Sequence, residues 1–292
     1  MESECGFEGN SDLYGLGVRL GIYVQWATSV LAEHLYEPAI SECRDVNTTF
    51  QIAMLAGLML ITTNVNTETL AVEGYVTLLF CFASAWLAGL QALSATRISR
   101  STGIVESRTQ NARRIGDLLL SIAVCSYGVW FLTRALDGLP RTNATCPEVV
   151  FFFAAVPLYG WFRALLTVVL ALGLVAPIIM TCLRALALAR EFSETVRRLW
   201  AQPPSYGSSA PPGLVRIASP SARKLLASLA GMVVFVLAVE LTLVWNGVYG
   251  VYSCSTFSQL FPLVVGATNF ARVAYQLLKS VLVGDTRLQW RF

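Results

Sequence analysis

The chain has 292 residues, of which 55% are hydrophobic and only 13% are charged, and its formal net charge is +3 at pH 7. Soluble domains carry about 25% charged residues, so a deficit spread over the whole length excludes a water-soluble domain with a single anchor. We predict an all-α polytopic membrane protein that forms a single domain over 1–292. The small net charge says little about partners, and we expect no nucleic acid among them.

The first residues, MESECGFEGNSD, are acidic and lack the basic region of a cleavable signal peptide. We therefore expect the first apolar segment to direct insertion itself. Backbone in lipid must be hydrogen-bonded internally, which favours helices, and the alternation of a membrane barrel is absent. Apolar runs of up to about 20 residues predict seven transmembrane helices, at roughly 14–33, 51–65, 73–95, 115–135, 162–186, 224–246 and 257–282.

The apolar stretch FFFAAVPLYGW at 151–161 is interrupted by Pro157 and Gly160, so it is not predicted to be a span. Its composition is compatible with an interfacial segment and equally with a re-entrant segment.

The basic residues predict the orientation of the helices. Lysine and arginine are concentrated in 96–114, in 184–224 and in the C-terminal tail, whereas 66–72 and 247–256 contain none. The positive-inside rule then predicts an outside or lumenal N-terminus and a cytosolic C-terminus. The Pro-, Gly- and Ser-rich stretch 202–221 is predicted to be a flexible cytosolic linker. We expect a multi-pass protein of the endoplasmic reticulum or another endomembrane.

Glycosylation motifs and cysteines bear on the same topology. The Asn143 motif falls in an outer loop and predicts a glycoprotein, whereas the Asn47 motif falls in an inner loop and should carry no glycan. Cys5, Cys146 and Cys254 all fall on the predicted outer side. Two of the three are free to form a disulfide, either Cys146 with Cys254 or Cys5 with either of them, and the sequence leaves the pairing open.

Glu240 is the only acidic residue in the long apolar stretch 224–247. An ionised carboxylate at the centre of a membrane helix costs about 2.5–3.5 kcal/mol on insertion scales. Glu240 must therefore be neutral, paired with a cation, or turned toward a polar cavity.

Polar and aromatic residues gather in the predicted outer half of the helices. Arg19, Tyr23 and Trp26 occur at i, i+4 and i+7, so a guanidinium, a phenol and an indole share one helical face. Two ordinary explanations remain open: an interfacial belt of Trp and Tyr, and an arginine whose charged end reaches the membrane surface. A third is an ion pair between Arg19 and Glu240.

Motifs for several kinds of chemistry are absent from the sequence. There is no Gly-rich phosphate loop, no His and Cys metal constellation, no Ser-His-Asp set and no aspartate motif for magnesium diphosphate. We expect no cofactor and no metal. Acid–base chemistry on a hydrophobic substrate remains possible, because burial keeps a carboxyl protonated and aromatic faces stabilise a carbocation. The candidates are Glu240 as the acid and Tyr23, Trp26, Trp130 and Trp245 as aromatic walls.

Two segments, CGFEGNSDLYGLGVRLGIYVQW (5–26) and ELTLVWNGVYGVYSCSTFSQLFPLVVG (240–266), resemble fungal seven-span integral membrane proteins. The nearest functional class is the membrane-bound terpene cyclases of the ascofuranone and ascochlorin type, which belong to meroterpenoid biosynthesis in secondary metabolism. The resemblance implies an isomerase that cyclises a prenylated, usually epoxidised substrate by protonation and without a metal. The positions that match the shared signature are Asn10, Asp12, Tyr14, Arg19, Gln25, Trp26, Glu240, Trp245, Asn246, Gln259 and Pro262.

The resemblance also suggests roles for residues. Catalysis is expected from Glu240, with Glu73 as a second acid by position. Binding of a hydrophobic small molecule, in contact with membrane lipid, is expected from Arg19, Tyr23, Trp26, Trp130, Trp245, Asn246 and Gln259.

Two other classes of function fit the sequence. Seven spans with an outer N-terminus are also typical of a transporter, channel or receptor-like protein without catalytic activity, although no internal repeat supports the transporter. A structural membrane protein, with Glu240 simply paired to Arg19, is the other possibility.

Overall fold

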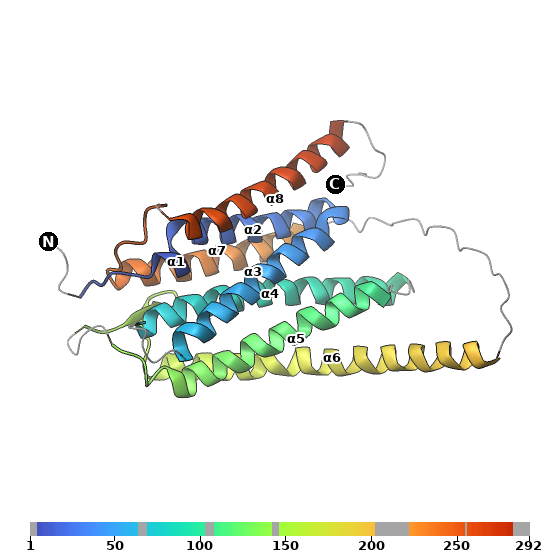
Figure 1. Ribbon diagram of the computed structural model, residues 1–292, viewed down its shortest axis with the longest axis horizontal. Coiled ribbons are helices and arrows are strands. Elements are labelled where there is room, and N and C mark those ends of the chain that lie inside the picture. Colours follow the sequence, from blue (N-terminus) through green and yellow to red (C-terminus); the bar gives the residue numbers. More distant parts are fainter. Residues whose placement is uncertain are drawn as a thin grey trace.

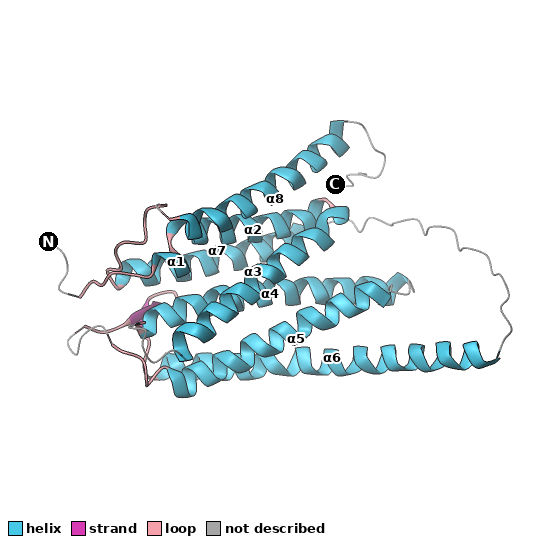
Figure 2. Ribbon diagram, viewed as in Figure 1, coloured by secondary structure: helices cyan, strands magenta, loops and turns pink. Residues whose placement is uncertain are grey.

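The computed structural model describes residues 5–63, 69–102, 108–141, 146–201, 222–254 and 256–282. The linker 202–221 and the Asn143 motif lie outside the described residues. The structure is about 81% helical, which confirms the all-α prediction (Figure 2). The helices are α1 (Ser11–Tyr14), α2 (Leu16–Leu35), α3 (Ile40–Thr63), α4 (Ala71–Thr102), α5 (Arg108–Trp130), α6 (Trp161–Ala201), α7 (Ala222–Trp245) and α8 (Phe257–Leu282), with a 3-10 turn η1 (Glu37–Ala39), a π-helical segment η2 (Phe131–Ala135) and strands β1 (Val149–Phe151) and β2 (Ala155–Pro157).

Four of the helices are long and apolar enough to cross a membrane. Within the described residues they are Ile40–Thr63, Asn111–Ala135, Trp161–Glu194 and Lys224–Trp245, in α3, α5 with η2, α6 and α7. The Trp161–Glu194 window is the most apolar, and only 6% of it is buried inside the protein. Such an uncovered apolar surface suits a helix that faces lipid rather than water.

Helix α3 begins well before the predicted span at 51–65. Its first residues are polar and charged, so their mean hydropathy is too low to predict a transmembrane helix. The charged side chains form ion pairs with residues of neighbouring helices. Three ion pairs join α3 to α5 and α8: Glu42–Arg272 at 2.5 Å, Arg44–Asp117 at 3.5 Å and Asp45–Arg113 at 3.4 Å. Asn47 is predicted from the sequence to lie in an inner loop, but it lies in this helix and is buried.

The helices lie roughly along one direction, with α6 at one side of the molecule and α8 at the other (Figure 1). Helix α2 packs against α8, α3 and α7, whereas α4 packs against α3, α5 and α7. Helix α6 packs mainly against α5. Helices α2 and α4 are therefore the interior elements on which the others assemble.

Glycines permit the closest helix contact, that of α2 with α8. A β-carbon at Gly17 would lie 2.4 Å from the Gln259 carbonyl oxygen, and one at Gly21 would lie 2.5 Å from the Pro262 carbonyl oxygen. A β-carbon at Gly266 would in turn lie 2.6 Å from the Gly21 carbonyl oxygen. The Gly17-x-x-x-Gly21 spacing is the small-residue pattern that lets membrane helices approach closely.

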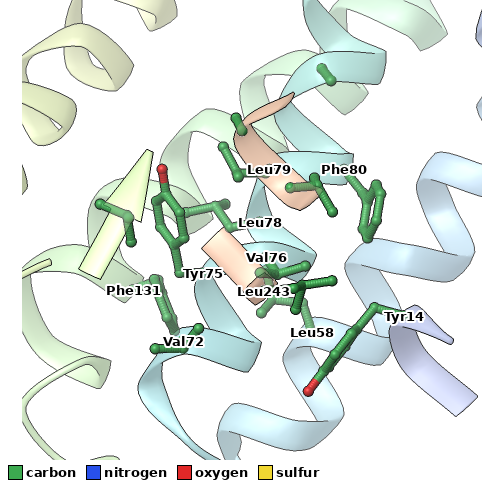
Figure 3. Close-up of a cluster of buried hydrophobic side chains, with 14 of the residues drawn as sticks. Tyr14, Leu58, Val72, Tyr75, Val76, Leu78, Leu79, Phe80, Phe131 and Leu243 are labelled. Atoms are coloured by element: carbon green, nitrogen blue, oxygen red, sulfur yellow. The ribbon is translucent and has the colours of Figure 1, made fainter. Parts of the chain in front are cut away.

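A cluster of fully buried side chains fills the space between α2, α3, α4, α7 and the end of α5 (Figure 3). Leu58, Val76, Phe131 and Leu243 are among its members, and each has no exposed surface. Lipid tails are as apolar as these side chains, so close van der Waals packing, rather than exclusion of water, stabilises such a cluster in a membrane.

The segment 151–161 is not a transmembrane helix, as the sequence predicts. Its first half belongs to an antiparallel hairpin in which Val150 pairs with Val156. Phe153, at the turn, has a positive φ of 58° and is 77% exposed. The hairpin, the N-terminal segment and the loop after α7 gather at one end of the helix bundle (Figure 1).

Arg163 stabilises the same end of α5 and α6. Its guanidinium donates two hydrogen bonds to the Asp137 carboxylate, at 2.6 and 2.7 Å, and its Nε donates to the Leu132 carbonyl in η2. A π-helical segment leaves carbonyls without regular partners, and Arg163 satisfies one of them. These hydrogen bonds hold the pKa of the Asp137 carboxyl below its usual range.

Candidate functional site

Arg19 lies near the start of α2 and is fully buried. Its Nη2 donates a hydrogen bond of 3.1 Å to the Val251 carbonyl in the loop after α7. The guanidinium carbon lies 5.0 Å from the centre of the Tyr252 ring, a cation–π distance. Arg19 therefore connects the beginning of α2 to a loop more than 200 residues away in sequence.

Glu240 is paired with this arginine. Its Oε1 lies 3.4 Å from the Arg19 Nε and accepts a hydrogen bond of 2.9 Å from the Tyr23 hydroxyl. Arg19 and Tyr23 sit one turn apart on α2, so the shared face predicted from their spacing does meet α7. Of the three situations expected for Glu240, the structure shows the paired one.

The carboxyl group of Glu240 is not enclosed by its partners. Its side chain is 33% exposed, whereas that of Arg19 is 0% exposed. In the described part of the chain, the recorded contacts of this carboxyl all involve Oε1. Oε2 is therefore the oxygen left for a bound molecule.

Trp26 lies beneath this pair and is fully buried. Its Nε1 donates a hydrogen bond of 3.0 Å to the Ser84 hydroxyl on α4, and its ring lies 5.7 Å from the Tyr23 ring and 6.3 Å from Phe80. Trp26 thus packs against the Tyr23 ring and limits its movement. Tyr23 is the aromatic residue that contacts Glu240 directly.

Glu73 belongs to a different cluster. Its Oε1 accepts hydrogen bonds from the Tyr14 hydroxyl at 2.6 Å and from the Asn10 amide at 2.9 Å, while Oε2 accepts one of 2.9 Å from the Leu70 amide. The last bond is that of a capping box, in which a glutamate in the first helical turn satisfies the amide before the helix. The side chain is 5% exposed, and among the described residues its recorded bonds do not connect it to Glu240.

Trp245 and Asn246 fasten the hairpin to the end of α7. The Asn246 side chain accepts from the Val149 amide at 3.1 Å and donates to the Val149 carbonyl at 2.6 Å. The Trp245 ring stacks on Phe151 with centres 6.0 Å apart. Asn246 also donates a hydrogen bond of 2.6 Å to the Thr242 carbonyl within α7, so these two predicted binding residues connect the end of α7 to the hairpin.

Gln259 and Trp130 lie at two other places. Gln259 is fully buried against Gly15 and Gly17 of the α2 terminus, and neither polar atom of its amide has a hydrogen-bond partner among the described residues. Trp130, on α5, is 41% exposed and packs 5.1 Å from Tyr127. The structure thus brings together Arg19, Tyr23, Trp26 and Glu240 and leaves the remaining predicted residues around them.

The structure shows which of the three outer cysteines form the disulfide. Cys5 and Cys146 form a disulfide with Cα atoms 5.5 Å apart, and Cys254 is a free, exposed thiol. One of the pairings left open by the sequence is therefore present, and it joins the N-terminal segment to the loop before β1.

One small apolar cavity lies inside the described part of the protein. It holds about 10 Å³ between α4 and α6, lined by Tyr75, Leu78, Leu79, Phe82, Leu166 and Leu170. This volume is at the lower limit for one water molecule, and Glu240 does not line it. Among the described residues there is no group of three or more His, Cys, Asp or Glu side chains placed to hold a metal ion.

No protein-family model, curated protein or solved structure matches this chain. The geometry of the site is therefore the basis for assigning a function.

Some contributors to the site were not predicted from the sequence. The Val251 carbonyl and the Tyr252 ring come from a polar loop, and no local pattern marks their contact with Arg19. The Gly17-x-x-x-Gly21 pattern, by contrast, is visible in the sequence and could have indicated the α2–α8 contact.

Proposed function

We propose that the chain is a membrane-bound, metal-independent terpene cyclase that protonates an epoxide or alkene of a prenylated, meroterpenoid substrate. One observation carries this proposal. The Glu240 side chain, in an apolar helix, is 33% exposed; among the described residues its Oε2 makes no hydrogen bond, while its Oε1 lies 3.4 Å from Arg19 and accepts a hydrogen bond of 2.9 Å from Tyr23. An acid that delivers a proton to a hydrophobic molecule needs an accessible oxygen and a stabilised conjugate base.

The proton-transfer step follows from this arrangement. When Oε2 carries the proton, the O–H bond breaks as the proton passes to the substrate oxygen or carbon, and the carboxylate remains. The Arg19 charge and the Tyr23 hydroxyl beside Oε1 interact more strongly with that carboxylate than with the neutral acid, so they favour the transition state over the ground state. With an epoxide, the protonated C–O bond breaks and its electron pair stays on the oxygen, whereas with an alkene the π pair forms the new C–H bond. The electron pair of a neighbouring double bond in the prenyl chain then forms the new carbon–carbon bond, and the final cation loses a proton to the Glu240 carboxylate, so the product is an isomer of the substrate.

The Tyr23 ring can stabilise the positive charge that forms on the substrate. It lies next to the acid and is held by Trp26 and Phe80, with ring centres 5.7 and 6.3 Å away. A carbocation over an aromatic face gains about 0.5–2 kcal/mol. The hydrophobic substrate would reach this site from the surrounding lipid, with no cofactor required.

The proposal extends to topology and location. Seven helices would cross the membrane, with the N-terminus lumenal, in the endoplasmic reticulum or another endomembrane. The Cys5–Cys146 disulfide supports this orientation, because disulfides persist in oxidising compartments. The Asn143 glycosylation motif, shortly before Cys146 in sequence, would then face the lumen.

Product formation tests the proposal. Microsomes containing the protein are given an aromatic compound with an epoxidised farnesyl chain, and the cyclic isomer is measured by mass spectrometry. We expect Glu240→Gln to lower the rate by about 10²–10⁴-fold, the usual contribution of a general acid. Glu194→Gln, at an exposed position of α6, is the matched control and should cyclise normally. Undiminished turnover by Glu240→Gln at normal expression would remove Glu240 from the reaction.

A non-catalytic structural protein is the second candidate, because the Arg19–Glu240 pair joins α2 to α7. In that case the exchange of charges in Arg19→Glu with Glu240→Arg should restore the thermal stability lost in each single variant. The cyclase instead predicts that the exchanged protein stays inactive even if it is stable.

A further inference from the structure

The N-terminal strap, residues 5–15, is fastened across the end of the bundle at four places. The disulfide from Cys5 attaches it to the loop before β1. Glu73 binds the Asn10 amide at 2.9 Å and thereby attaches the strap to α4. The Asp12 carboxylate accepts hydrogen bonds from Thr256, at 3.3 Å, and from Ser258, at 2.5 Å, next to the start of α8.

The fourth attachment is to the loop 247–254. The Gly9 amide donates to the Tyr249 carbonyl at 2.9 Å, and the Tyr249 amide donates to the Phe7 carbonyl at 3.0 Å. A β-carbon at Gly250 would lie 3.3 Å from the Glu8 side chain. The strap therefore fixes the position of this loop by two backbone hydrogen bonds and a close contact.

The same loop covers Arg19. The Tyr252 ring lies over the guanidinium, with 5.0 Å between the guanidinium carbon and the ring centre, and is itself 47% exposed. The guanidinium beneath it has no exposed surface. The loop has glycine in the left-handed region at Gly247 and Gly250, with φ of 62° and 77°.

Two nitrogens of Arg19 remain without a hydrogen bond under this ring. Among the described residues, neither Nε nor Nη1 has a hydrogen-bond partner, although Nε faces Glu240. Buried donors without partners are rare and costly in proteins, and each one calls for an explanation. A ligand oxygen that replaces the missing acceptor is such an explanation.

We infer that the Arg19 guanidinium binds the head of the substrate, an aromatic ring that carries a hydroxyl or carboxyl group, and that Tyr252 covers this site when it is empty. The substrate ring takes the place of the Tyr252 ring over the guanidinium, and its oxygen accepts a hydrogen bond from Nη1. The strap, through its hydrogen bonds to the loop 247–254, determines how firmly the Tyr252 ring is held over Arg19. This inference rests on the proposed function, because it names the head group of the molecule that Glu240 protonates.

Binding of 3-pentadecylphenol to the purified protein in detergent, measured by calorimetry, tests the inference without any turnover. Tyr252→Ala should bind this phenol roughly 5–30-fold more tightly than the wild type, the change expected when the competing cation–π contact between Tyr252 and Arg19 is removed. The paired change Cys5→Ser with Cys146→Ser should shift affinity in the same direction by a smaller factor. Tyr249→Ala, in the same loop, keeps the backbone bonds and should leave affinity unchanged.

Two further arms separate ring recognition from simple partition into the detergent. The saturated analogue 3-pentadecylcyclohexanol should bind all variants equally weakly, and Arg19→Lys should lose selectivity for the phenol because an ammonium lacks the planar stacking face. Unchanged or weaker phenol binding by Tyr252→Ala would overturn the inference, as would equal binding of the two analogues by the wild type. Failure of the proposed function is a separate result, namely undiminished turnover by Glu240→Gln.

Discussion

Glu73 and Glu240 are two acidic residues in apolar helices near the same end of the bundle, and their surroundings differ in one decisive respect. Glu73 is buried and accepts three hydrogen bonds that use both of its oxygens. Glu240 is only partly buried, and its recorded contacts all use Oε1. A carboxylate with both oxygens satisfied by donors of its own chain stabilises a fold, whereas one with an accessible oxygen can also react.

The comparison also separates the two tyrosines that donate to these carboxylates. Tyr14 is fully buried and helps Glu73 fasten the strap, whereas Tyr23 is partly buried beside the accessible carboxyl. The same pair of chemical groups, a phenol and a carboxylate, thus attaches the strap to α4 at Glu73. At Glu240 we propose that it takes part in proton transfer.

Removing the charge of Glu73 should produce the largest loss of stability. Glu73→Gln leaves one acceptor oxygen for three donors and places an amide N–H against one of them. Each buried donor left unsatisfied costs about 1–3 kcal/mol. We expect a clear drop in the melting temperature, followed by circular dichroism in detergent, whereas Glu240→Gln should lower it by less. A larger loss in Glu240→Gln would reverse the roles given to the two residues.

The α2–α8 contact supports the candidate site, because α2 carries both partners of Glu240, Arg19 and Tyr23. Gly21→Ala places a methyl group 2.5 Å from the Pro262 backbone, and such overpacking costs about 1–3 kcal/mol. Gly116→Ala is the matched control, since nothing lies within 4 Å of a β-carbon there. Thermal unfolding should show a loss in the first variant and none in the second, and equal melting temperatures would contradict the close contact.

Tyr23→Phe tests the contribution of one donor to Glu240. It removes the 2.9 Å hydrogen bond and keeps the ring. A hydrogen bond to a charged group contributes about 1.5–3 kcal/mol, which corresponds to a roughly tenfold to hundredfold slower cyclisation if the bond strengthens in the transition state. Turnover of the wild-type and variant proteins measures it, with Tyr127→Phe on α5 as the control. Equal rates for Tyr23→Phe and the wild type would mean that this bond is only structural.

The smallest effect concerns pH, at the Asp137–Arg163 pair outside the reactive site. The pKa of Asp137 is lowered in the folded protein by the hydrogen bonds from Arg163, so this pair stabilises the fold above the usual aspartate pKa of about 3.9. That contribution should disappear as the pH falls through the lowered pKa. Melting temperatures of the wild type and Asp137→Asn should differ slightly at pH 7 and converge on acidification, once the pH has fallen below the lowered pKa of Asp137. A difference that grows on acidification would contradict the sign of this shift.

Much of the helical framework could be predicted from hydropathy alone, because a long apolar segment in lipid has few alternatives to a helix. The prediction missed the start of α3, since Glu42, Arg44 and Asp45 lower its hydropathy and their partners lie on other helices. It also missed the hairpin at 149–157, whose position depends on the two hydrogen bonds between Val149 and the Asn246 side chain.

The reactive site was predictable only in part. The spacing of Arg19 and Tyr23 showed that they share a face, and Glu240 stood out as an isolated acid. Arg19, Tyr23 and Glu240 meet only because α2 packs against α7. Tyr252 covers Arg19 only because the strap holds the loop that carries Tyr252. These are long-range contacts, for which local sequence patterns carry no information.

The central claim, that Oε2 of Glu240 is open to a reagent that enters from the lipid, is tested most directly by modification with dicyclohexylcarbodiimide, a hydrophobic reagent that reacts with carboxyl groups when they carry a proton. Purified protein in lipid nanodiscs is treated with the reagent, digested and examined by mass spectrometry. We expect a stable adduct on Glu240 and none on Glu73. Adduct on Glu73 with Glu240 unmodified would contradict the account.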